Sequence, residues 1–458
     1  MEKAHKIKNM KNEKIIVIGA GLCGTLMSMR LSQRGYDVDV YEKRSDPRAE
    51  GYEGGRSINL ALSDRGLASL AMVGLDDDVR SELIPMYGRM IHADDGSTGK
   101  LYKYSGRPDE YINSVSRSGL NIKLLEEADK FDNIDFYFDT ECLDVNTDTT
   151  TVTIKMDGEI QTLKADVILA TDGAGSAARK SFERQGNKMR FDFSVKYLDT
   201  GYKELSLPAK ADGSWAIDEN ALHIWPREGF MMIALPNLDG SFTLTLFIPF
   251  EGPNSLEQLT TDAEIMTFFQ KNFPKLEEYY AHMLQDFHEN PTSSLGTIRC
   301  YPWLRNKTLL LGDSAHAIVP FYGQGMNCAF EDCKVLDELL DKYEGDWDQV
   351  LPKYQEVRKP DTDAIADLAE DNFYEMRDAT ADPIFNKKRQ IELALEQQYP
   401  DYYSKYSLVT FREDLPYHKA MAQGRRQNEI LMDIAAEVSD VSNVNLQEVL
   451  DTVKAKMA

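Results

Sequence analysis

An apolar run that ends in three spaced glycines constrains the fold of this 458-residue chain more than any other feature. Lys14–Ile18 is typical of a strand buried on both faces of a parallel sheet, and Gly19, Gly21 and Gly24 follow it in the spacing GxGxxG. Glycine at these places permits a tight turn, lets a pyrophosphate approach the backbone and lets a helix pack on the strand. The helix predicted over residues 22–34 would then present its N-terminal amides to the phosphates. The pattern predicts a dinucleotide-binding βαβ unit.

The next predicted strand ends on an acidic residue. Glu42 follows Val38–Tyr41 at the place where a carboxylate would bind the ribose hydroxyls of a dinucleotide. A glycine-rich helix cap in another α/β fold is the alternative, but strand, helix and carboxylate together favour dinucleotide binding. Asp172–Gly173, after the predicted strand Ala165–Leu169, reads as an ordinary strand-to-helix turn with Ser176 as the helix cap.

A second glycine-rich stretch, far downstream, suits the rest of a flavin nucleotide. The apolar run Thr308–Leu311 leads to Gly312 and Asp313, whose carboxylate would accept hydrogen bonds from ribityl hydroxyls. Pro320 then bends the chain, and Gly323–Asn327 begin a helix whose amides would face the N1–C2=O edge of a flavin. Ordinary turn glycines are the simpler alternative. The succession of strand, carboxylate, proline, glycines and helix favours the flavin interpretation.

Composition excludes several functional classes. A formal net charge of −24 repels polyanions, so nucleic acid is not an expected partner. No apolar run reaches the roughly 18–20 residues of a membrane span, and the lysine-rich Met1–Lys14 has no apolar core, so we expect neither a membrane anchor nor a signal peptide. The five cysteines form no CxxC pair, which is typical of reduced thiols and predicts a cytoplasmic protein. The seven histidines show no metal-binding spacing, so no metal site is predicted.

The middle of the chain is rich in strands and its end is helical. Residues 221–225, 230–235 and 242–248 are β-branched and aromatic runs separated by turn residues, and they predict an antiparallel sheet. From about Thr362 onward the pattern is charged and helical. The final segment, Ser442–Leu450, is amphipathic and polar, which favours a soluble protein over one with an apolar C-terminal anchor.

Taken in order, these motifs resemble those of the class A flavoprotein aromatic hydroxylases over nearly the whole chain. A closer likeness, to the branch that hydroxylates L-kynurenine, is carried by Gly55–Ser63, Gly88–Met90, Asn220–Pro226, Ala234–Asn237 and Pro320–Asn327. The resemblance implies an α/β fold: a glutathione-reductase-like FAD-binding Rossmann domain, an inserted antiparallel-sheet substrate domain and a C-terminal helical region. The FAD-binding domain would comprise residues 1–75, 112–185 and 296–345, the substrate domain residues 76–111 and 186–295, and the helical cap residues 346–458.

The resemblance also assigns substrate-binding residues. Arg89 would hold the α-carboxylate of the substrate in a fork-to-fork pairing, and Tyr104, Asn372 and Tyr406 would complete this polar end. Phe321 would pack on the aromatic ring beside the flavin. Without the resemblance, Arg89 would be an exposed surface charge, Tyr104 an amphipathic surface side chain, Asn372 an exposed helix residue and Tyr406 a core phenol.

The same resemblance implies a set of FAD-contacting residues and one departure from the family pattern. Arg117 would contact FAD, although pairing with a neighbouring acid is its simpler role. The expected cofactor-binding residues are Gly19, Gly21, Leu22, Gly24, Glu42, Lys43, Arg44, Ala61, Arg117, Cys142, Asp313, Gly323, Gln324, Gly325, Met326 and Asn327. Tyr322 stands where the family often has histidine; its ring preserves packing, but it does not carry a proton at neutral pH.

The implied reaction is hydroxylation of L-kynurenine to 3-hydroxy-L-kynurenine in tryptophan degradation, with FAD reduced by NADPH and O2 activated at flavin C4a. No side chain is expected to act as an essential base, because the aniline nitrogen already activates the ring. The resemblance also explains the absence of a second glycine-rich fingerprint for NADPH. Two alternatives stay open: the same chemistry on another aromatic amino or phenolic acid, and a flavin-binding sensor without turnover.

Overall fold

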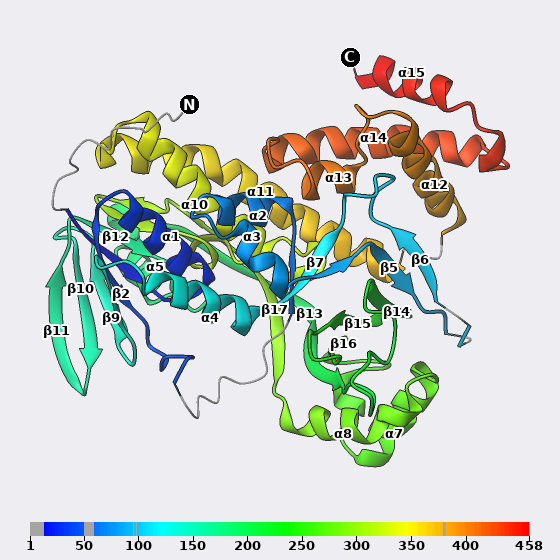
Figure 1. Cartoon of the computed structure of the whole chain (residues 1–458), viewed down its shortest axis with the longest axis horizontal. Coiled ribbons are helices and arrows are strands. Elements are labelled where there is room, and N and C mark those ends of the chain that lie inside the picture. The colour runs from blue at the N-terminus through cyan, green and yellow to red at the C-terminus, as the bar shows by residue number, and fades with distance from the viewer. Residues whose placement is uncertain (1–12, 50–58, 95, 98, 379–381, 458) are drawn as a thin grey trace.

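The computed structural model describes residues 13–49, 59–94, 96–97, 99–378 and 382–457. Two features named above therefore lie outside the described residues in part: the N-terminal segment through residue 12, and the first four residues of Gly55–Ser63. The chain forms a nucleotide-binding α/β region, a large mixed sheet and a layer of C-terminal helices (Figure 1).

A six-stranded sheet forms the first region. Its central strand β1 is parallel to both neighbours, β12 and β2, and its residues Ile15–Val17 are fully buried. Only the edge pair β18–β19 is antiparallel. The strands, in spatial order, are β18 (Leu304–Arg305), β19 (Thr308–Leu310), β12 (Val167–Ala170), β1 (Lys14–Ile18), β2 (Asp37–Tyr41) and β8 (Ile134–Tyr137). The predicted strands at 14–18, 38–41, 165–169 and 308–311 are thus confirmed.

Helices cover this sheet, and two small sheets extend it. Helix α1 contacts α4 and α10, and all three contribute to one apolar core with the strands. Ser176 caps α5 as predicted, because its Oγ accepts from the amide of Arg179 at 2.9 Å. The helices are α1 (Leu22–Gln33), α2 (Asp64–Ala71), α3 (Asp76–Val79), α4 (Arg117–Ala128), α5 (Ala177–Arg184), α6 (Gly186–Met189), α9 (Asp313–His316) and α10 (Gly325–Lys342). The small antiparallel sheets are β11 (Glu159–Lys164), β10 (Thr151–Met156) and β9 (Glu141–Asn146), and β3 (Asn59–Leu62), β7 (Ile112–Ser116) and β4 (Ile84–Met86).

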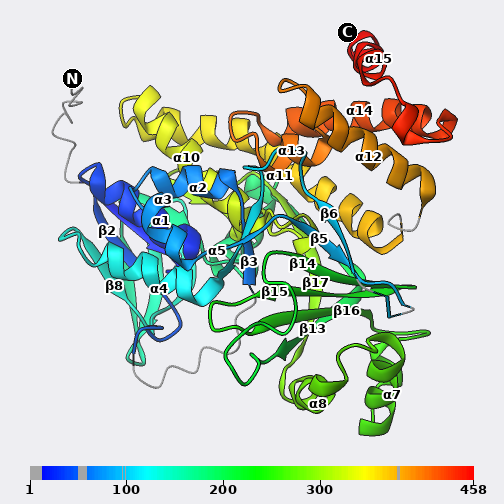
Figure 2. The same cartoon turned by 45° about the vertical axis from the view of Figure 1, so that its right-hand side comes forward.

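A seven-stranded sheet forms the second region, and it confirms the predicted antiparallel strands at 221–225, 230–235 and 242–248. One face packs on α7 and α8 and the other faces the C-terminal helices, as Figures 1 and 2 both show. Only β14 and β5 pair in parallel. The strands, in spatial order, are β17 (Thr292–Tyr301), β13 (Asp192–Leu207), β16 (Phe242–Pro249), β15 (Phe230–Pro236), β14 (Leu222–Arg227), β5 (Gly88–Ile91) and β6 (Lys100–Lys103), and the helices are α7 (Asp262–Asn272) and α8 (Tyr280–Glu289).

The first of the C-terminal helices, α11, starts at Trp347, next to the expected start of the helical region at residue 346 and before the charged helical pattern that was noted from about Thr362. Its first part packs in the nucleotide-binding core and its second part against the seven-stranded sheet, so one helix joins both regions. The helices are α11 (Trp347–Asp378), α12 (Pro383–Gln398), α13 (Lys405–Thr410), α14 (Tyr417–Glu437) and α15 (Leu446–Met457). Short 3-10 turns occur at Arg80–Glu82, Leu256–Gln258, Glu277–Tyr279, Pro320–Tyr322 and Val441–Asn443.

One strand crosses an expected domain boundary, and another pairs with a strand on the other side of one. β17 runs through residue 296, and β4, expected in the substrate domain, pairs with β7 of the expected FAD-binding domain. The division by residue number therefore stays a prediction. Within the described part of the chain, no helix combines the length and the apolar character that crossing a bilayer requires.

Candidate active site

A cavity of about 440 Å³ lies where the carboxyl ends of β1, β12 and β19 meet the seven-stranded sheet. Ligands of open α/β sheets bind at this end of the strands. The cavity brings together thirteen of the site residues predicted from the sequence, from segments far apart in the chain. They are Gly21, Leu22, Ala61, Arg89, Tyr104, Arg117, Asp313, Phe321, Tyr322, Gly323, Gly325, Met326 and Tyr406.

The three glycines of the first turn serve different purposes. A Cβ on Gly19 would lie 2.7 Å from the carbonyl oxygen of Thr171, and one on Gly24 would lie 2.0 Å from the carbonyl oxygen of Gly19. These two glycines let α1 pack tightly against the sheet. Gly21 has no atom within 4 Å of its Cβ position and lines the cavity. It therefore keeps free the space in front of the N-terminus of α1.

Asp313 also lines the cavity, at the start of α9 just after β19. It follows Gly312, whose φ of 63° and ψ of −143° favour glycine. Burial by the surrounding protein raises the pKa of Asp313, and the nearby positive charge of Arg117 opposes this rise. A carboxylate that is enclosed but open to the cavity is suited to accept hydrogen bonds from a hydroxyl-bearing ligand.

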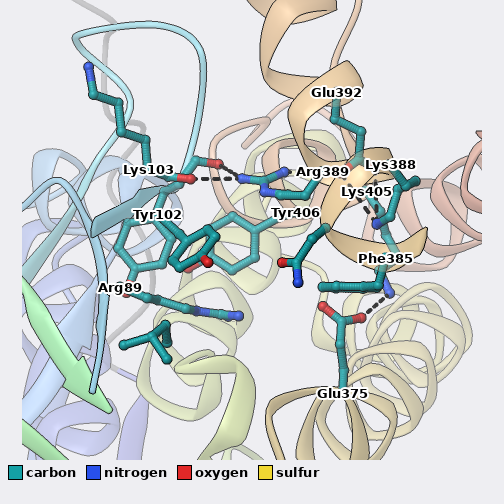
Figure 3. Close-up of a pocket in the computed structure, with 13 residues that line it drawn as sticks. Arg89, Tyr102, Lys103, Glu375, Phe385, Lys388, Arg389, Glu392, Lys405 and Tyr406 are labelled. Atoms are coloured by element: carbon teal, nitrogen blue, oxygen red, sulfur yellow. Dashed lines mark hydrogen bonds and ion pairs between the residues drawn. The ribbon is translucent and has the colours of Figure 1, made fainter. Parts of the chain in front are cut away.

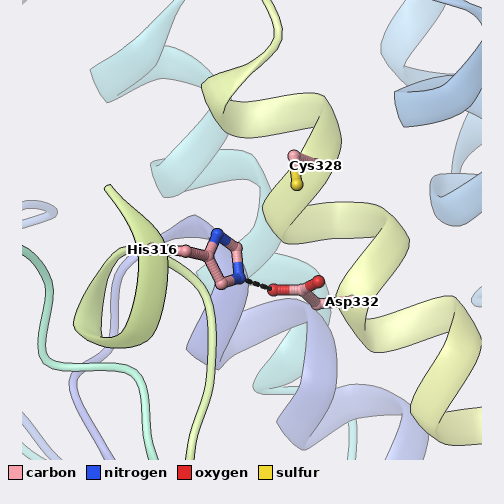
Figure 4. Close-up of side chains that lie close together, drawn as sticks. All are labelled: His316, Cys328 and Asp332. Carbon is pink, nitrogen blue, oxygen red and sulfur yellow. Dashed lines mark hydrogen bonds and ion pairs between the residues drawn. The ribbon is translucent and has the colours of Figure 1, made fainter. Parts of the chain in front are cut away.

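A buried charge network holds the Gly312 turn in place. Asp332 on α10 accepts from the amide of Gly312 at 3.1 Å and from Arg358 Nε at 2.9 Å. It also accepts from His316 Nε2 at 2.6 Å (Figure 4). Burial opposes its ionisation, but His316 and Arg358 outweigh burial and lower the pKa of Asp332. His316, Cys328 and Asp332 lie close enough to ligate a metal ion together. The guanidinium of Arg358 in the same cluster disfavours a cation, so we interpret it as a structural network.

The turn before α10 completes the cofactor side of the cavity. Gly323 has a φ of 66°, and its Cβ position lies 3.0 Å from Ala61. Gly325 and Met326 line the cavity at the N-terminus of α10, where free amides favour electron-rich groups. Together with the α1 N-terminus and Asp313, this arrangement fits FAD: amides for the pyrophosphate, a carboxylate for the ribityl chain and a helix start for the ring.

Three stacked tyrosines and one arginine form the opposite wall. The ring of Tyr406 stacks on Tyr322 at 5.5 Å and on Tyr104 at 5.0 Å between centroids. The guanidinium of Arg89 lies over the rings of Tyr406 and Tyr104, at 5.3 Å and 5.7 Å. Its Nε and the hydroxyls of Tyr104 and Tyr322 are buried without a hydrogen-bond partner among the described residues. Burial raises the pKa of Tyr104, Tyr322 and Tyr406, so all three phenols stay protonated.

Phe321 lies between two other aromatic rings. Its centroid is 4.9 Å from that of Phe247 on β16 and 4.5 Å from that of Phe373 on α11. Asn372, expected at the polar end of the substrate, does not line the cavity here; its Nδ2 donates to the carbonyl oxygen of Phe321 at 2.5 Å. The structure thus places Asn372 behind Phe321, where it fixes the position of that ring.

Several expected FAD contacts also lie behind the cavity surface. The carboxylate of Glu42 accepts from the amides of Ala20 and Arg44 at 3.0 and 2.9 Å, and so links the glycine turn after β1 to the segment after β2. The side chain of Asn327 donates to the carbonyl oxygens of Ala61 and Gly323, both at 2.8 Å. The expected cofactor residues that do not line the cavity are Gly19, Gly24, Glu42, Lys43, Arg44, Cys142, Gln324 and Asn327. Their contact with FAD stays a prediction.

The sequence did not single out the apolar floor of the cavity. Ile233 and Leu235 on β15 and Phe247 on β16 line it, together with Met376 from α11. The two-residue spacing of Ile233 and Leu235 places them on one face of the sheet, and that signal was readable. Which face meets a ligand depends on the packing of α7 and α8 on the other side, and the sequence pattern does not reveal this.

Comparison with known proteins gives concordant matches. A protein-family description, "FAD binding domain", matches residues 12–369. The kynurenine 3-monooxygenase of Flavobacterium johnsoniae is 44% identical over 94% of this chain and 95% of its own. Those of Myxococcus xanthus and Dictyostelium discoideum are 40% and 42% identical, over 98% and 96% of this chain and 96% of each relative.

Solved structures agree on the fold. 2-Methyl-3-hydroxypyridine-5-carboxylic acid oxygenase has a TM-score of 0.66 and 23% identity, over 86% of this chain and 99% of that one. Klebsiella pneumoniae HpxO complexed with FAD has a TM-score of 0.65 and 20% identity, over 83% and 94% of the two chains. At this level of identity the likeness concerns the fold, and it supports the α/β architecture with an inserted sheet.

Proposed function

The chain belongs to the kynurenine 3-monooxygenase family of FAD-binding enzymes, and on this premise we propose that it hydroxylates L-kynurenine at ring carbon 3. In the balanced reaction, one atom of O2 is inserted into the ring C–H bond and the other leaves as water. NADPH and one proton supply the reducing equivalents, and NADP⁺ is released. Bound FAD supplies the redox and oxygen-transfer chemistry.

The observation that carries this proposal is Arg89, a partly buried guanidinium that lines the cavity and forms no ion pair among the described residues. A desolvated cation is costly unless an anion joins it, and a bidentate carboxylate matches the guanidinium fork. Arg89 lines the cavity from β5 of the seven-stranded sheet, whereas Gly21 and Asp313, which we assign to FAD, follow strands of the six-stranded sheet. An amino-acid carboxylate held at Arg89 would direct the rest of its molecule toward the flavin.

The remaining residues would orient the substrate and exclude water. Tyr104 and Tyr406 flank Arg89, and we propose that their hydroxyls donate to the same carboxylate. Phe321, fixed by Asn372 and two neighbouring rings, would pack on the substrate ring. No histidine–carboxylate pair lines the cavity among the described residues, which agrees with a reaction that needs no side-chain base. The protein then contributes by orienting the substrate and by excluding water from the site.

Tyr322 preserves packing where the family often has histidine. Its ring stacks on Tyr406, and burial raises its pKa well above the ordinary value, so it would stay neutral throughout the cycle. We therefore propose that no proton is relayed through this position. We also propose a cytoplasmic location, since all five cysteines are free thiols.

The test is direct. Purified protein should show a flavin spectrum, and L-kynurenine should stimulate NADPH oxidation and yield 3-hydroxy-L-kynurenine by mass spectrometry. A panel of other aromatic amino and phenolic acids tests the substrate assignment: faster turnover of another acid would replace L-kynurenine. Bound FAD without substrate-stimulated NADPH oxidation would instead support a non-catalytic flavin sensor.

A further inference from the structure

A second, smaller cavity of about 80 Å³ adjoins the active-site cavity (Figure 3). It lies between the β5–β6 hairpin, the end of α11, and helices α12 and α13. Arg89, Tyr104 and Tyr406 line both cavities and form the wall between them. We name this space the cationic chamber; its charged lining residues are Arg89, Lys103, Glu375, Lys388, Arg389, Glu392 and Lys405.

Two carboxylates and four cationic side chains line the chamber, those of Arg89, Lys388, Arg389 and Lys405, whereas the exposed side chain of Lys103 points away from it (Figure 3). Lys405 Nζ lies 3.0 Å from Glu375, while Lys388 Nζ and Arg389 share Glu392, at 3.3 and 3.2 Å. Arg89 has no carboxylate partner in the described part of the chain. The excess of positive charge is notable because the whole chain has a net charge of −24.

These cations act together on Glu375. Burial alone would raise the pKa of this carboxyl, but Lys405, Lys388 and Arg89 outweigh burial and lower it from 4.5 to about 2. One carboxylate therefore responds to three cations that surround it. Lys388 is only 3% exposed, so its charge is poorly screened by solvent. The chamber is thus a site of positive potential whose own carboxylates do not balance it.

The size of the chamber restricts what it holds. At the ~10–15 Å³ that one water occupies on this measure, it accommodates roughly five to eight waters. This is enough for a carboxylate and its nearest atoms, and too little for an aminobenzoyl ring as well. We propose that the cationic chamber is a docking subsite for the α-carboxylate of the amino-acid substrate, occupied on its way to Arg89. The inference rests on the proposed function, because L-kynurenine supplies the carboxylate.

Charges that dock a ligand before it is fully bound act mainly on the association rate. The test is stopped-flow binding of L-kynurenine to the FAD-loaded enzyme, followed by flavin fluorescence. Lys388→Met and Lys405→Met should each lower the association rate constant about 3- to 10-fold. Added salt should lower this rate constant less in the two variants than in the parent enzyme. Glu375→Gln should raise it by about 3-fold. Lys271→Met, a matched change on the distant, exposed end of α7, should leave it unchanged.

Kynuramine, the substrate without its carboxylate, separates docking from general damage. Its association should not slow in Lys388→Met or Lys405→Met. The proposal would be overturned if L-kynurenine associated equally fast with the parent enzyme and with both lysine variants. It would also be overturned if the association rate constant fell in Glu375→Gln as it does in the two lysine variants. If Lys388→Met fails to fold, Lys405→Met decides, since its side chain is 14% exposed. Failure of the parent enzyme to bind L-kynurenine would refute the proposed function itself.

Discussion

Replacing Arg89 by Met tests the carboxylate site at its centre. Methionine retains the length and apolar character of the side chain and can pack against the rings of Tyr104 and Tyr406, but it removes the charge and the fork of donors. The guanidinium has no carboxylate partner among the described residues, so its removal leaves no buried acid unpaired. The substitution therefore separates ligand binding from fold stability better than most changes in a buried site.

The expected loss follows from the geometry. Truncating one partner of a desolvated, hydrogen-bonded charge pair costs about 2–5 kcal/mol. Arg89 is partly accessible through two cavities, so we expect the lower part of this range, about 2–4 kcal/mol. At 1.4 kcal/mol per tenfold change, the Kd for L-kynurenine should rise about 30- to 1000-fold. Arg89→Lys keeps the charge without the fork of donors, so its Kd for L-kynurenine should lie between that of the parent enzyme and that of Arg89→Met.

The assay is equilibrium titration of the FAD-loaded enzyme with L-kynurenine, followed by the flavin spectrum, with FAD content and the melting temperature recorded in parallel. FAD should be retained, and the melting temperature should change little, because Glu375 keeps its ion pair with Lys405 when Arg89 is replaced. Arg80→Met is a matched control, since Arg80 is exposed and distant from the cavity. A Kd within about 3-fold of the parent value, less than 1 kcal/mol, would remove Arg89 from the substrate site.

Four further outcomes are expected. Asp332→Asn weakens the network that holds the Gly312 turn, so it should raise the Kd of the apoprotein for FAD about 10-fold or more. Quenching of FAD fluorescence measures this Kd. Asp337→Asn on the same helix is the control and should leave the Kd unchanged. Gly24→Ala should abolish FAD binding or folding, assayed by flavin content and circular dichroism, because its Cβ would lie 2.0 Å from a main-chain oxygen. The pKa of Glu375 falls from 4.5 to about 2 on folding, so the ionised carboxylate contributes fully to stability above pH 4.5 and this contribution is lost as the pH drops toward 2. The free energy of unfolding of Glu375→Gln, measured in urea, should therefore depend less on pH across this window. Tyr322→Phe should keep or raise the melting temperature and keep NADPH oxidation, since its hydroxyl is buried without a partner.

The sequence predicted the glycine turns and Asp313 on the side of the cavity that we assign to FAD. Gly19 and Gly24 are required because a Cβ at either would collide with main chain a few residues away or on the adjacent strand. Such requirements are local, and they leave a fixed spacing in the sequence. Asp313 was found for the same reason, since it follows directly on a buried strand and a glycine turn.

Residues that act through other residues were harder to assign. Asn372 was expected to contact the substrate, but in the structure its amide holds the carbonyl of Phe321. Glu42 and Asn327 likewise engage the main chain of neighbouring turns. A polar side chain in a sequence does not show which partner it meets, because the choice depends on which distant backbone group lies within about 3 Å of it after packing.

By itself, the sequence determined the nucleotide-binding architecture and the two glycine-rich turns and, through family likeness, indicated the substrate that we propose. Periodicity, glycine spacing and long identities are all properties of neighbouring residues, and they survive without a structure. Only the tertiary structure decided that Arg89 stands between two cavities and that Lys388 and Lys405 face it from the C-terminal helices. The physical reason is that the potential at a site depends on the charges that packing brings together and shields from water, and these come from segments that no local pattern connects.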